Sequence, residues 1–382
     1  MKIMLVAGEH SGDGHGAALA RALRAARPDL KLFGLGGAGM REAGVEILFD
    51  PTRIAVVGLT EVLKHWPDFK RMFNLAVAAL DERKPDLVVL IDYPGFNLRF
   101  AEQVKRRGIP LVYFISPQIW AWGGGRIRKI KQLVNRMLVL FPFEEALYKK
   151  AGVPVTFIGH PFIESVKPTG ANRLEALEKM GLADGMPVIG LLPGSREKEV
   201  TRLLPTMLAA CERLEQALPS TARFLLIKVP NLPWELYRPI LAASPIQPKV
   251  VERWDYDGLY ACDLVLVASG SATLECALLE RPMVILYKTS WPTYLLSRLL
   301  IRIPVIGLAN IAAGRKIAPE LIQRDASAEK IAETALALWQ EKPRREKMQE
   351  AFKEMRRNLG GPGAIRRAAQ EILRELPAKS GS

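Results

Sequence analysis

The stretch IMLVA-GEHSGDGHG-AALARALRAA, residues 3–26, decides the fold class. It opens with five consecutive apolar residues, Ile3–Ala7, continues with a glycine-bearing segment, Gly8–Gly16, and ends in an amphipathic segment, Ala17–Ala26. A continuous apolar run is typical of a parallel strand buried on both faces, and the last segment has the periodicity of a helix. We therefore expect a strand, a turn and a helix, the unit from which parallel α/β sheets are built.

The same unit recurs along the chain. Leu87–Ile91, Leu111–Ile115 and Met137–Phe141 are further apolar runs separated by helical segments. After a stretch rich in glycine and proline, the pattern restarts at Val188–Leu192 and continues through Leu264–Val267. Strands that alternate with helices predict a parallel sheet, and the restart predicts a second one.

The length agrees with two domains, because 382 residues are more than one hydrophobic core usually organises. We predict an α/β protein with Rossmann-like domains at 1–170 and 186–325. Helices at 326–376 follow and pack back on the first domain or on a partner subunit. Ligands of open parallel sheets bind beyond the carboxyl ends of the strands, and a cleft between two such domains suits a reaction of two substrates.

Composition narrows the class of partner. The net charge of +14 and the pI of about 9.7 indicate an anionic partner such as nucleic acid, acidic lipid or a phosphorylated substrate. The 3 cysteines and 4 histidines show no metal-ligand spacing, so we expect no metal site and no cofactor. Met1 and Lys2 lead directly into the first strand without a secretory signal, and no run is long and apolar enough to span a membrane, which predicts a cytoplasmic protein.

Two loops of the first half carry polar side chains directly after strands. Asp92 follows an apolar strand, where partial burial raises the pKa of a carboxyl group and suits a general base. The competing interpretation is an N-cap for the next helix, a role that Asn97 would fill equally well. In the first loop, Glu9, Ser11 and Asp13 suggest contacts to a ligand rich in hydroxyl groups.

The glycines of the first half also satisfy a dinucleotide-binding fingerprint. Gly12 and Gly14 with Ala17 match it after the first strand, and three glycines match it again after the second. Dinucleotide binding further requires an acid at the end of the second strand, for a ribose hydroxyl, and that position is glycine here. We therefore expect a tight turn with close backbone approach, and no dinucleotide.

The second half carries two segments suited to an anion. Gly194, Ser195 and Arg196 end its first strand, where glycine lets backbone N–H groups approach a phosphate and arginine pairs with it. A solvated arginine in a turn is the competing interpretation. Ser269, Gly270 and Ser271 open a helix after a later strand, and Glu275 lies one turn further on. The alternative there is a plain capped helix, but together these segments predict a metal-free grip on a nucleoside diphosphate.

Two amphipathic segments combine apolar and basic residues in a way that suits an anionic bilayer surface. They are 56–73 and 291–303, and an ordinary helix docked on a sheet is the competing interpretation for each. The net charge favours peripheral membrane binding. The residues expected to contact the membrane are Trp66, Phe69, Trp291, Leu295, Arg298 and Leu299.

Seven sequence blocks stand out along the chain: Glu9-x-Ser11-Gly12-Asp13, Ile91-Asp92-x-Pro94-x-Phe96-Asn97, Ser116-Pro117-x-x-Trp120-Ala121-Trp122, Phe157-Ile158-Gly159-His160-Pro161, Leu192-Pro193-Gly194-Ser195-Arg196, Ala268-Ser269-Gly270-x-Ala272-x-Leu274-Glu275 and Asn310-x-x-Ala313-Gly314-Arg315. In order and in spacing, from Met1 to about residue 375, they resemble the lipid-A-disaccharide synthase family.

The resemblance implies a GT-B architecture of two Rossmann-like domains and a role in lipid A and lipopolysaccharide synthesis. It implies an inverting glycosyltransferase that joins UDP-2,3-diacylglucosamine to 2,3-diacylglucosamine 1-phosphate (lipid X). The products are UDP and the β-1,6-linked disaccharide 1-phosphate. By resemblance, Asp92 is an essential acid, Arg196, Glu275, Asn310 and Arg315 surround UDP, and the polar residues of the first loop bind substrate. Gly95 departs from relatives that carry a second acid there.

A mechanism follows from these expectations. Arg196 and the helix start at 269–273 stabilise the charge on departing UDP, and Asp92, or Glu9 as second choice, takes the proton from the acceptor 6-hydroxyl. Because both substrates carry acyl chains, we expect the protein on the cytoplasmic face of the inner membrane. The sequence leaves open whether it forms a homodimer.

Three other functions compete with this one. Another UDP-sugar GT-B enzyme, such as an epimerase or a peptidoglycan-type transferase, would bind UDP without needing acyl chains. A basic nucleic-acid-binding module would account for the charge and for the tryptophans beside basic residues, but no nucleic-acid motif is present, so nucleic acid is not expected as a partner. A non-catalytic nucleotide-binding scaffold would tolerate replacement of Asp92.

Overall fold

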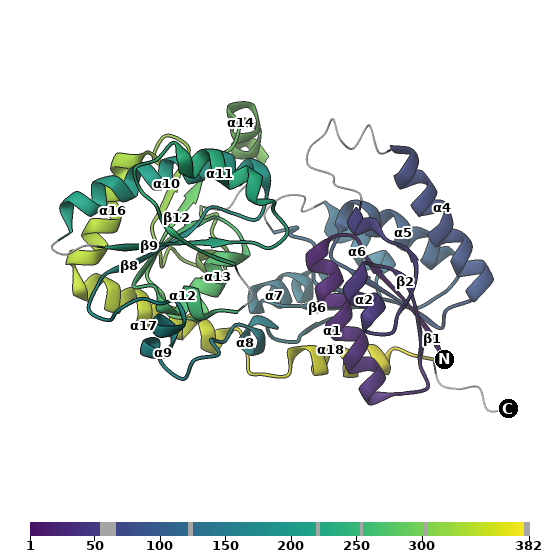
Figure 1. Ribbon diagram of the computed structural model, residues 1–382. Helices are drawn as coiled ribbons and strands as arrows, with labels where there is room; N and C mark the ends of the chain where they lie inside the picture. The colour runs from purple at the N-terminus through teal and green to yellow at the C-terminus, as the bar shows by residue number, and fades with distance from the viewer. Residues whose placement is uncertain (54–65, 121–124, 219–221, 253–254, 301–303, 378–382) are drawn as a thin grey trace. The chain divides into compact units, whose positions relative to one another are not determined.

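The computed structural model describes residues 1–53, 66–120, 125–218, 222–252, 255–300 and 304–377. The chain forms two compact units, one of Met1–Pro161 with Gly360–Ser382 and one of Phe162–Leu359. Each unit is a twisted parallel sheet between helices (Figure 1). Among the described residues, no helix combines the length and apolar character that crossing a bilayer requires.

The sheet of the first unit has seven parallel strands in the order β3-β2-β1-β4-β5-β6-β7. They are β1 (Lys2–Ala7), β2 (Lys31–Leu35), β3 (Glu46–Phe49), β4 (Leu87–Ile91), β5 (Leu111–Phe114), β6 (Arg136–Val139) and β7 (Val155–Phe157). The strand order reverses between β1 and β4, which pair directly. Such a reversal is the place where doubly wound sheets bind their ligands.

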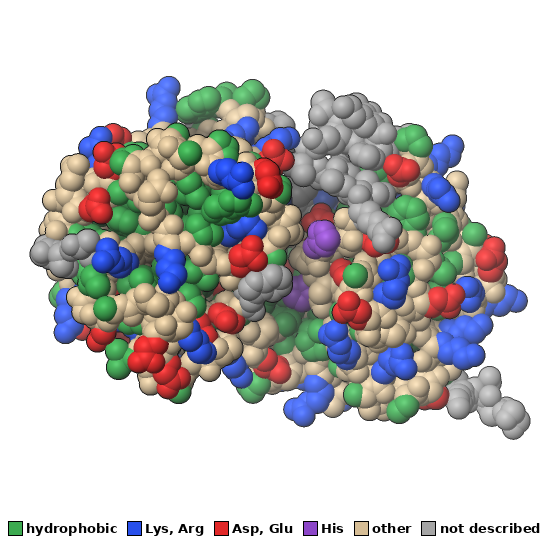
Figure 2. Space-filling view, in the orientation of Figure 1, with side chains coloured by type: hydrophobic (Ala, Val, Ile, Leu, Met, Phe, Trp, Pro, Cys, Tyr) green, Lys and Arg blue, Asp and Glu red, His purple; other side chains and the backbone are tan. Residues whose placement is uncertain are grey.

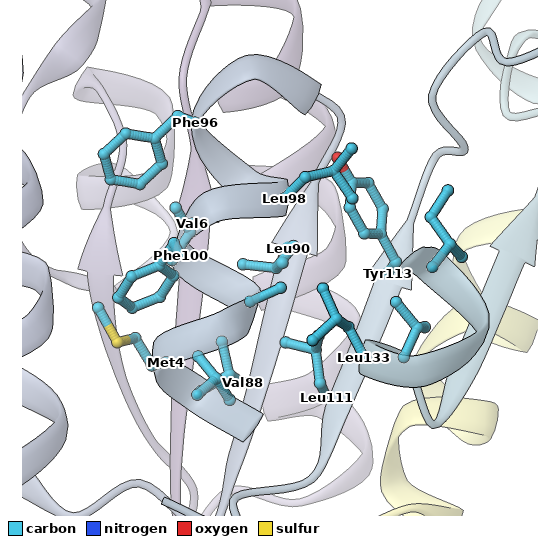
Figure 3. Close-up of a cluster of buried hydrophobic side chains, with 14 of the residues drawn as sticks. Met4, Val6, Val88, Leu90, Phe96, Leu98, Phe100, Leu111, Tyr113 and Leu133 are labelled. Atoms are coloured by element: carbon cyan, nitrogen blue, oxygen red, sulfur yellow. The ribbon is translucent and has the colours of Figure 1, made fainter. Parts of the chain in front are cut away.

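Helices cover both faces of this sheet. They are α1 (His10–Ala26), α2 (Ala38–Glu42), α4 (Trp66–Arg83), α5 (Pro94–Arg106), α6 (Arg126–Leu133), α7 (Pro142–Ala151) and α18 (Ala364–Arg374), with a short 3-10 turn at Pro51–Arg53. A core of buried apolar side chains joins the sheet to α4, α5 and α6, and Figure 3 shows Phe96 and Phe100 of α5 lying over Val6, Val88 and Leu90. Burial of this apolar surface is the main favourable contribution to the unit's stability.

The sheet of the second unit has six parallel strands in the order β10-β9-β8-β11-β12-β13, with its reversal between β8 and β11. The strands are β8 (Val188–Leu192), β9 (Arg223–Lys228), β10 (Lys249–Glu252), β11 (Leu264–Ala268), β12 (Met283–Tyr287) and β13 (Glu320–Ile322). The helices are α8 (Phe162–Ser165), α9 (Arg173–Lys179), α10 (Glu197–Ala217), α11 (Trp234–Ala242), α12 (Asp257–Ala261), α13 (Ser271–Leu278), α14 (Trp291–Leu300), α15 (Leu308–Ala313), α16 (Ala328–Gln340) and α17 (Lys342–Asn358).

The C-terminal helices divide between the units. Helix α16 packs on α10, and α17 packs on α13 and α15, all within the second unit. Helix α18 packs on α1 of the first unit. Its contacts there include Arg367 Nε donating to the carbonyl of Ile158 at 2.8 Å and an ion pair of 3.0 Å between Arg136 and Glu375.

The expected loop Gly8–Gly16 is wrong, because α1 already begins at His10. One of its glycines serves helix packing, because a Cβ at Gly16 would lie 2.6 Å from Sδ of Met40. Gly16 therefore lets α1 approach α2 closely instead of forming a turn.

Candidate active site

The two sheets place their candidate residues at the same topological position. Glu9 follows β1 and Asp92 follows β4, on the two sides of the first strand-order reversal. In the second unit, Arg196 follows β8 and Ser269 follows β11, on the two sides of the second reversal. Each unit therefore presents one set of predicted residues where its sheet is built to hold a ligand.

Asp92 lies in an unusual turn at the end of β4. Its φ is 46° and that of Tyr93 is 49°, so two successive residues with side chains adopt the left-handed conformation. Helix α5 has Tyr93 as its N-cap and no capping hydrogen bond from a side chain. The competing interpretation of Asp92 as a helix cap is therefore wrong, and its carboxylate remains available for chemistry.

The electrostatic surroundings of Asp92 suit a general base. Burial and, to a smaller extent, the nearby charge of Glu9 raise the pKa of this carboxyl group to about 6, although a hydrogen bond from the backbone of Tyr93 acts in the opposite direction. A base with a pKa close to the working pH is both ionised and able to accept a proton. Desolvation and like charge together therefore tune Asp92 for proton abstraction.

Gly8 allows the two loops to meet. A Cβ at this position would lie 2.1 Å from Cδ1 of Tyr93, so the tyrosine ring occupies the space that a side chain would need. Any other residue at Gly8 would push Tyr93 away and with it the turn that carries Asp92. In the sequence, this residue is visible only as a glycine directly after a strand. The fold shows that the Tyr93 ring takes the space of its missing side chain.

The other predicted residues of the first loop differ in exposure and in hydrogen bonding. Ser11 is exposed and Gly12 is buried. The carboxylate of Asp13 accepts hydrogen bonds from the backbone N–H groups of Gly37, Gly39 and Met40 at 2.7, 2.9 and 3.0 Å. These bonds satisfy the start of α2, so Asp13 in this structure holds the turn between β2 and α2.

In the second unit, the loops after β8 and β11 line one open pocket of about 170 Å³. The predicted residues among its lining are Gly194, Ser195, Arg196, Ser269, Gly270 and Ser271. Helix α13 begins at Ser271, and the first N–H groups of a helix have no partner within it. Such N–H groups and the helix dipole favour an anion, which makes this pocket a candidate site for a diphosphate.

Glu199 takes part in this pocket, although the sequence reasoning missed it. Its carboxylate accepts hydrogen bonds from the backbone N–H groups of Ser195 and Arg196 at 3.0 and 3.3 Å, and from the Arg196 guanidinium at 2.9 Å. Glu199 stands at the capping-box position three residues after the N-cap, but the N-cap is Arg196 and not a serine or threonine, so the usual sequence signature is lacking. Glu199 therefore already pairs with these two N–H groups and with one nitrogen of the guanidinium.

Glu320, also missed, fixes the segment beside the start of α13. It accepts hydrogen bonds from the backbone N–H groups of Ile306 (3.0 Å) and Gly307 (2.8 Å) and from the side-chain amide of Asn310 (2.8 Å). The carbonyl of Ile306 in turn accepts a hydrogen bond of 2.9 Å from the Ser269 hydroxyl. One carboxylate thus ties the residues before α15 to the pocket.

Three predicted nucleotide-binding residues do not line the pocket. Asn310 is fully buried, and its side-chain oxygen accepts hydrogen bonds from the backbone of Ile317 and Ala318. Glu275 is buried in α13 and accepts a hydrogen bond from the hydroxyl of Tyr256 at 3.4 Å. Arg315 is exposed, and it forms an ion pair of 2.6 Å with Glu354 of α17. In this structure Asn310 supports the loop after α15 and contacts no open space.

The residues predicted to contact a membrane are described in part. Trp291 and Leu295 of α14 are 48% and 58% exposed, and the guanidinium of Arg324 lies 5.2 Å from the ring centre of Trp291. Figure 2 shows hydrophobic side chains gathered at the surface over α14. Phe69 of α4 is half-buried and packs against the core. The side chains of Trp66, Arg298 and Leu299, and residues 56–65, lie outside the described residues.

Comparison with known proteins identifies the family. Residues 3–374 match the family described as lipid-A-disaccharide synthetase. A lipid-A-disaccharide synthase from Trichlorobacter lovleyi is 45% identical over 372 residues, covering 97% of each chain. The chain belongs to the lipid-A-disaccharide synthase family. It is therefore a glycosyltransferase of lipid A synthesis, as the seven sequence blocks predicted.

Other comparisons agree in family and in fold. The lipid-A-disaccharide synthase of Myxococcus xanthus is 42% identical over 376 residues, which is 98% of both chains. Among solved structures, the UDP-GlcNAc 2-epimerase of Neisseria meningitidis bound to UDP-GlcNAc has a TM-score of 0.65 at 15% identity, covering 98% of this chain and 100% of that one. The calicheamicin glycosyltransferase CalG4 has a TM-score of 0.59 at 16% identity, covering 100% and 99%. The fold class is α/β with GT-B architecture, as predicted.

Proposed function

We propose that this synthase joins UDP-2,3-diacylglucosamine to 2,3-diacylglucosamine 1-phosphate and releases UDP and the β-1,6-linked disaccharide 1-phosphate. The proposal rests on one observation: a candidate base and a candidate anion pocket occur at equivalent places in the two units. One unit has a half-buried carboxylate of raised pKa at its strand-order reversal. The other has an anion pocket, formed by a helix start and an arginine, at the equivalent place.

The pocket of the second unit binds the donor's diphosphate. The Arg196 guanidinium and the first N–H groups of α13 donate hydrogen bonds to phosphate oxygens. These donors stabilise the negative charge that grows on UDP as the bond between its phosphate oxygen and the sugar's anomeric carbon breaks. Glu320 and Ser269 hold the pocket in shape, which spares the enzyme a rearrangement during the reaction.

Asp92 of the first unit is the general base. It accepts the proton of the acceptor 6-hydroxyl while that oxygen forms the new bond to the anomeric carbon. Attack opposite to departing UDP inverts the anomeric centre. Glu9 raises the basicity of Asp92 through its charge, and Ser11 at the start of α1 is exposed and able to bind a substrate hydroxyl.

The acylated substrates place the enzyme at an anionic membrane, on the cytoplasmic face of the inner membrane. Exposed Trp291 and Leu295, with Arg324 beside Trp291, support contact of α14 with lipid. Flotation with vesicles that contain anionic lipid tests this contact. A Trp291→Ala, Leu295→Ser variant is expected to bind less, and Leu174→Ser, at an equally exposed leucine of α9, to bind normally. Equal flotation of all three proteins would refute a role for α14.

The deciding experiment supplies both lipid substrates in mixed micelles with EDTA present and follows UDP and disaccharide together. Equal amounts of the two products are expected, because the grip on the diphosphate needs no metal. UDP release without disaccharide, or formation of an epimerised UDP-sugar, would overturn the proposal. Light scattering on the same preparation distinguishes a monomer from the homodimer that the sequence left open.

A further inference from the structure

The turn that carries Asp92 is strained and needs an external restraint. Asp92 and Tyr93 both have positive φ, at 46° and 49°, although neither is glycine. Side-chain-bearing residues adopt this conformation at a cost in free energy and keep it only when their surroundings enforce it. Such strain is concentrated at functional sites, so the groups that hold the turn are candidates for a functional role.

Two buried side chains hold the turn at a single atom. The carbonyl oxygen of Asp92 accepts a hydrogen bond from the hydroxyl of Tyr113 at 2.7 Å and another from Nδ2 of Asn97 at 2.6 Å. Tyr113 lies on β5 and Asn97 on α5, and both side chains are fully buried. The backbone N–H of Asp92 also donates to the carbonyl of Phe114 at 3.1 Å. The peptide group after Asp92 is therefore fixed from the neighbouring strand and from the following helix.

We propose that Tyr113, together with Asn97, is a positioning residue that keeps the Asp92 turn in its left-handed form and so keeps the carboxylate half-buried and close to Glu9. The inference rests on the proposed role of Asp92 as the base, and it goes beyond that role by naming what sets the base's position. Tyr113 acts through the main chain of Asp92 and touches no substrate.

The charged and titratable groups around this site determine what loss of the restraint does. Glu9 at the start of α1 and burial both raise the pKa of Asp92, and Tyr93 is the titratable neighbour in the same turn. Tyr113 faces Asp92 from β5, and Arg126 of α6 acts on Tyr113. When the turn relaxes, the carboxylate gains water and moves away from Glu9. Its pKa then falls toward the ordinary value of an aspartate, and it becomes a weaker base.

The test is Tyr113→Phe in the full-length enzyme, with kinetics measured from pH 4.5 to 8. We expect kcat to fall about tenfold, the effect of losing one buried hydrogen bond of ordinary strength. We also expect an unchanged KM for the UDP-sugar and an acid limb of the pH profile displaced to lower pH. Asn97→Ala removes the second donor and is expected to change kcat and the acid limb in the same direction.

Tyr148→Phe is the matched control. Tyr148 is also fully buried in the first unit, and its hydroxyl shares a hydrogen bond of 2.9 Å with Ser116, away from the Asp92 carbonyl. It should lose similar thermal stability and keep the wild-type acid limb. A Tyr113→Phe enzyme whose acid limb matches that of wild type would overturn the inference, as would an equal displacement in Tyr148→Phe.

Failure of this inference differs from failure of the proposed function. If Asp92→Asn abolishes turnover while Tyr113→Phe behaves as wild type, Asp92 is the base and the restraint is unimportant. If Asp92→Asn turns over normally, the base is another group, and the proposed mechanism falls together with the inference.

Discussion

The two strand-order reversals of this protein share a topology and differ in chemistry. At the first reversal, between β1 and β4, the loops that follow these strands carry Glu9 and Asp92. The residues there with left-handed backbone conformation are Asp92 and Tyr93. At the second, between β8 and β11, the loops contain Arg196 and a helix start, and the residues with positive φ are Gly194 and Gly270. The fold thus fixes where a ligand binds, and the loop residues fix what is done to it.

The contrast between the left-handed residues follows from what each loop must do. An anion site needs bare backbone close to the ligand, which glycine permits without strain. A base must present a side chain, so the first loop accepts a strained aspartate and holds it with buried hydrogen-bond donors. The following predictions test this division, in order of decreasing effect.

Replacing the base gives the largest effect. We expect Asp92→Asn to lower kcat by about 10² to 10⁴-fold, the usual contribution of a positioned general base. The affinity for UDP should stay unchanged, because the nucleotide pocket belongs to the other unit. Asp81→Asn changes an exposed carboxylate of the first unit that pairs with Arg107, and it should leave kcat as it is. Weaker UDP binding by Asp92→Asn in calorimetry would contradict the assignment of the base to the first unit and of nucleotide binding to the second.

Removing the arginine of the second reversal has the next effect. We expect Arg196→Ala to weaken UDP binding by roughly 10- to 100-fold, because a charge-assisted hydrogen bond to phosphate is lost. Arg213→Ala removes an exposed arginine of α10 that pairs with Glu329, and serves as the control. Titration calorimetry with UDP compares the two proteins. Equal affinities would mean that the guanidinium does not contact the nucleotide.

The fall of kcat/KM at low pH reports the pKa of Asp92 at the first strand-order reversal. Asp92 must be ionised to accept a proton, so kcat/KM should rise as the pH passes through about 6, where its carboxyl group titrates, and level off above that pH. Glu9→Gln removes a like charge that raises this pKa, so the limb should move to lower pH. The measurement is kcat/KM from pH 4.5 to 8 for both proteins. A limb that stays in place would show that burial alone sets the pKa of Asp92.

The smallest expected effect concerns stability and a buried acid outside the proposed chemistry. Burial raises the pKa of Glu144 from 4.5 to about 7, although the indole of Trp120 and the backbone of Phe141 donate to it. The folded state therefore binds more protons than the unfolded state in this range, and its stability falls as pH rises from 4.5 to about 7.

Glu144→Gln should flatten this fall. The variant should match wild type near pH 5 and exceed it at pH 8 by about 1 kcal/mol, because a buried charge is removed. Chemical denaturation at the two pH values compares the proteins. A variant that is less stable than wild type at pH 8 would show that the ionised carboxylate is needed by its donors.

The sequence predicted the strands where hydrophobic patterning is continuous. The bounds of β4 and β8 agree with the apolar runs Leu87–Ile91 and Val188–Leu192, because both strands are buried on both faces. The short edge strands β3 and β13 went unpredicted, since they are half-buried and have only 4 and 3 residues. Their pairing depends on the neighbouring strand more than on their own sequence.

The candidate site was predictable in location and less so in the role of each polar residue. Asp92 and Arg196 follow strands that the pattern identifies, so their place at a sheet edge could be inferred. Asp13 and Asn310 stand in the same kinds of motif, yet their side chains bind backbone groups of their own unit. A polar residue in a motif can bind either a ligand or the chain itself, and only the fold shows which. Glu320 was missed because its partners precede it by 10 to 14 residues.

The return of α18 to the first unit has a consequence for synthesis on the ribosome. The first unit is assembled from both ends of the chain, whereas the second is one continuous segment, Phe162–Leu359. The second unit therefore has its whole sequence outside the ribosome before the first one does, although its synthesis begins later. Until Ala364–Arg374 emerges, the surface of α1 that this helix covers stays open to water and to other nascent chains. The unit that is made first is thus the one that is finished last.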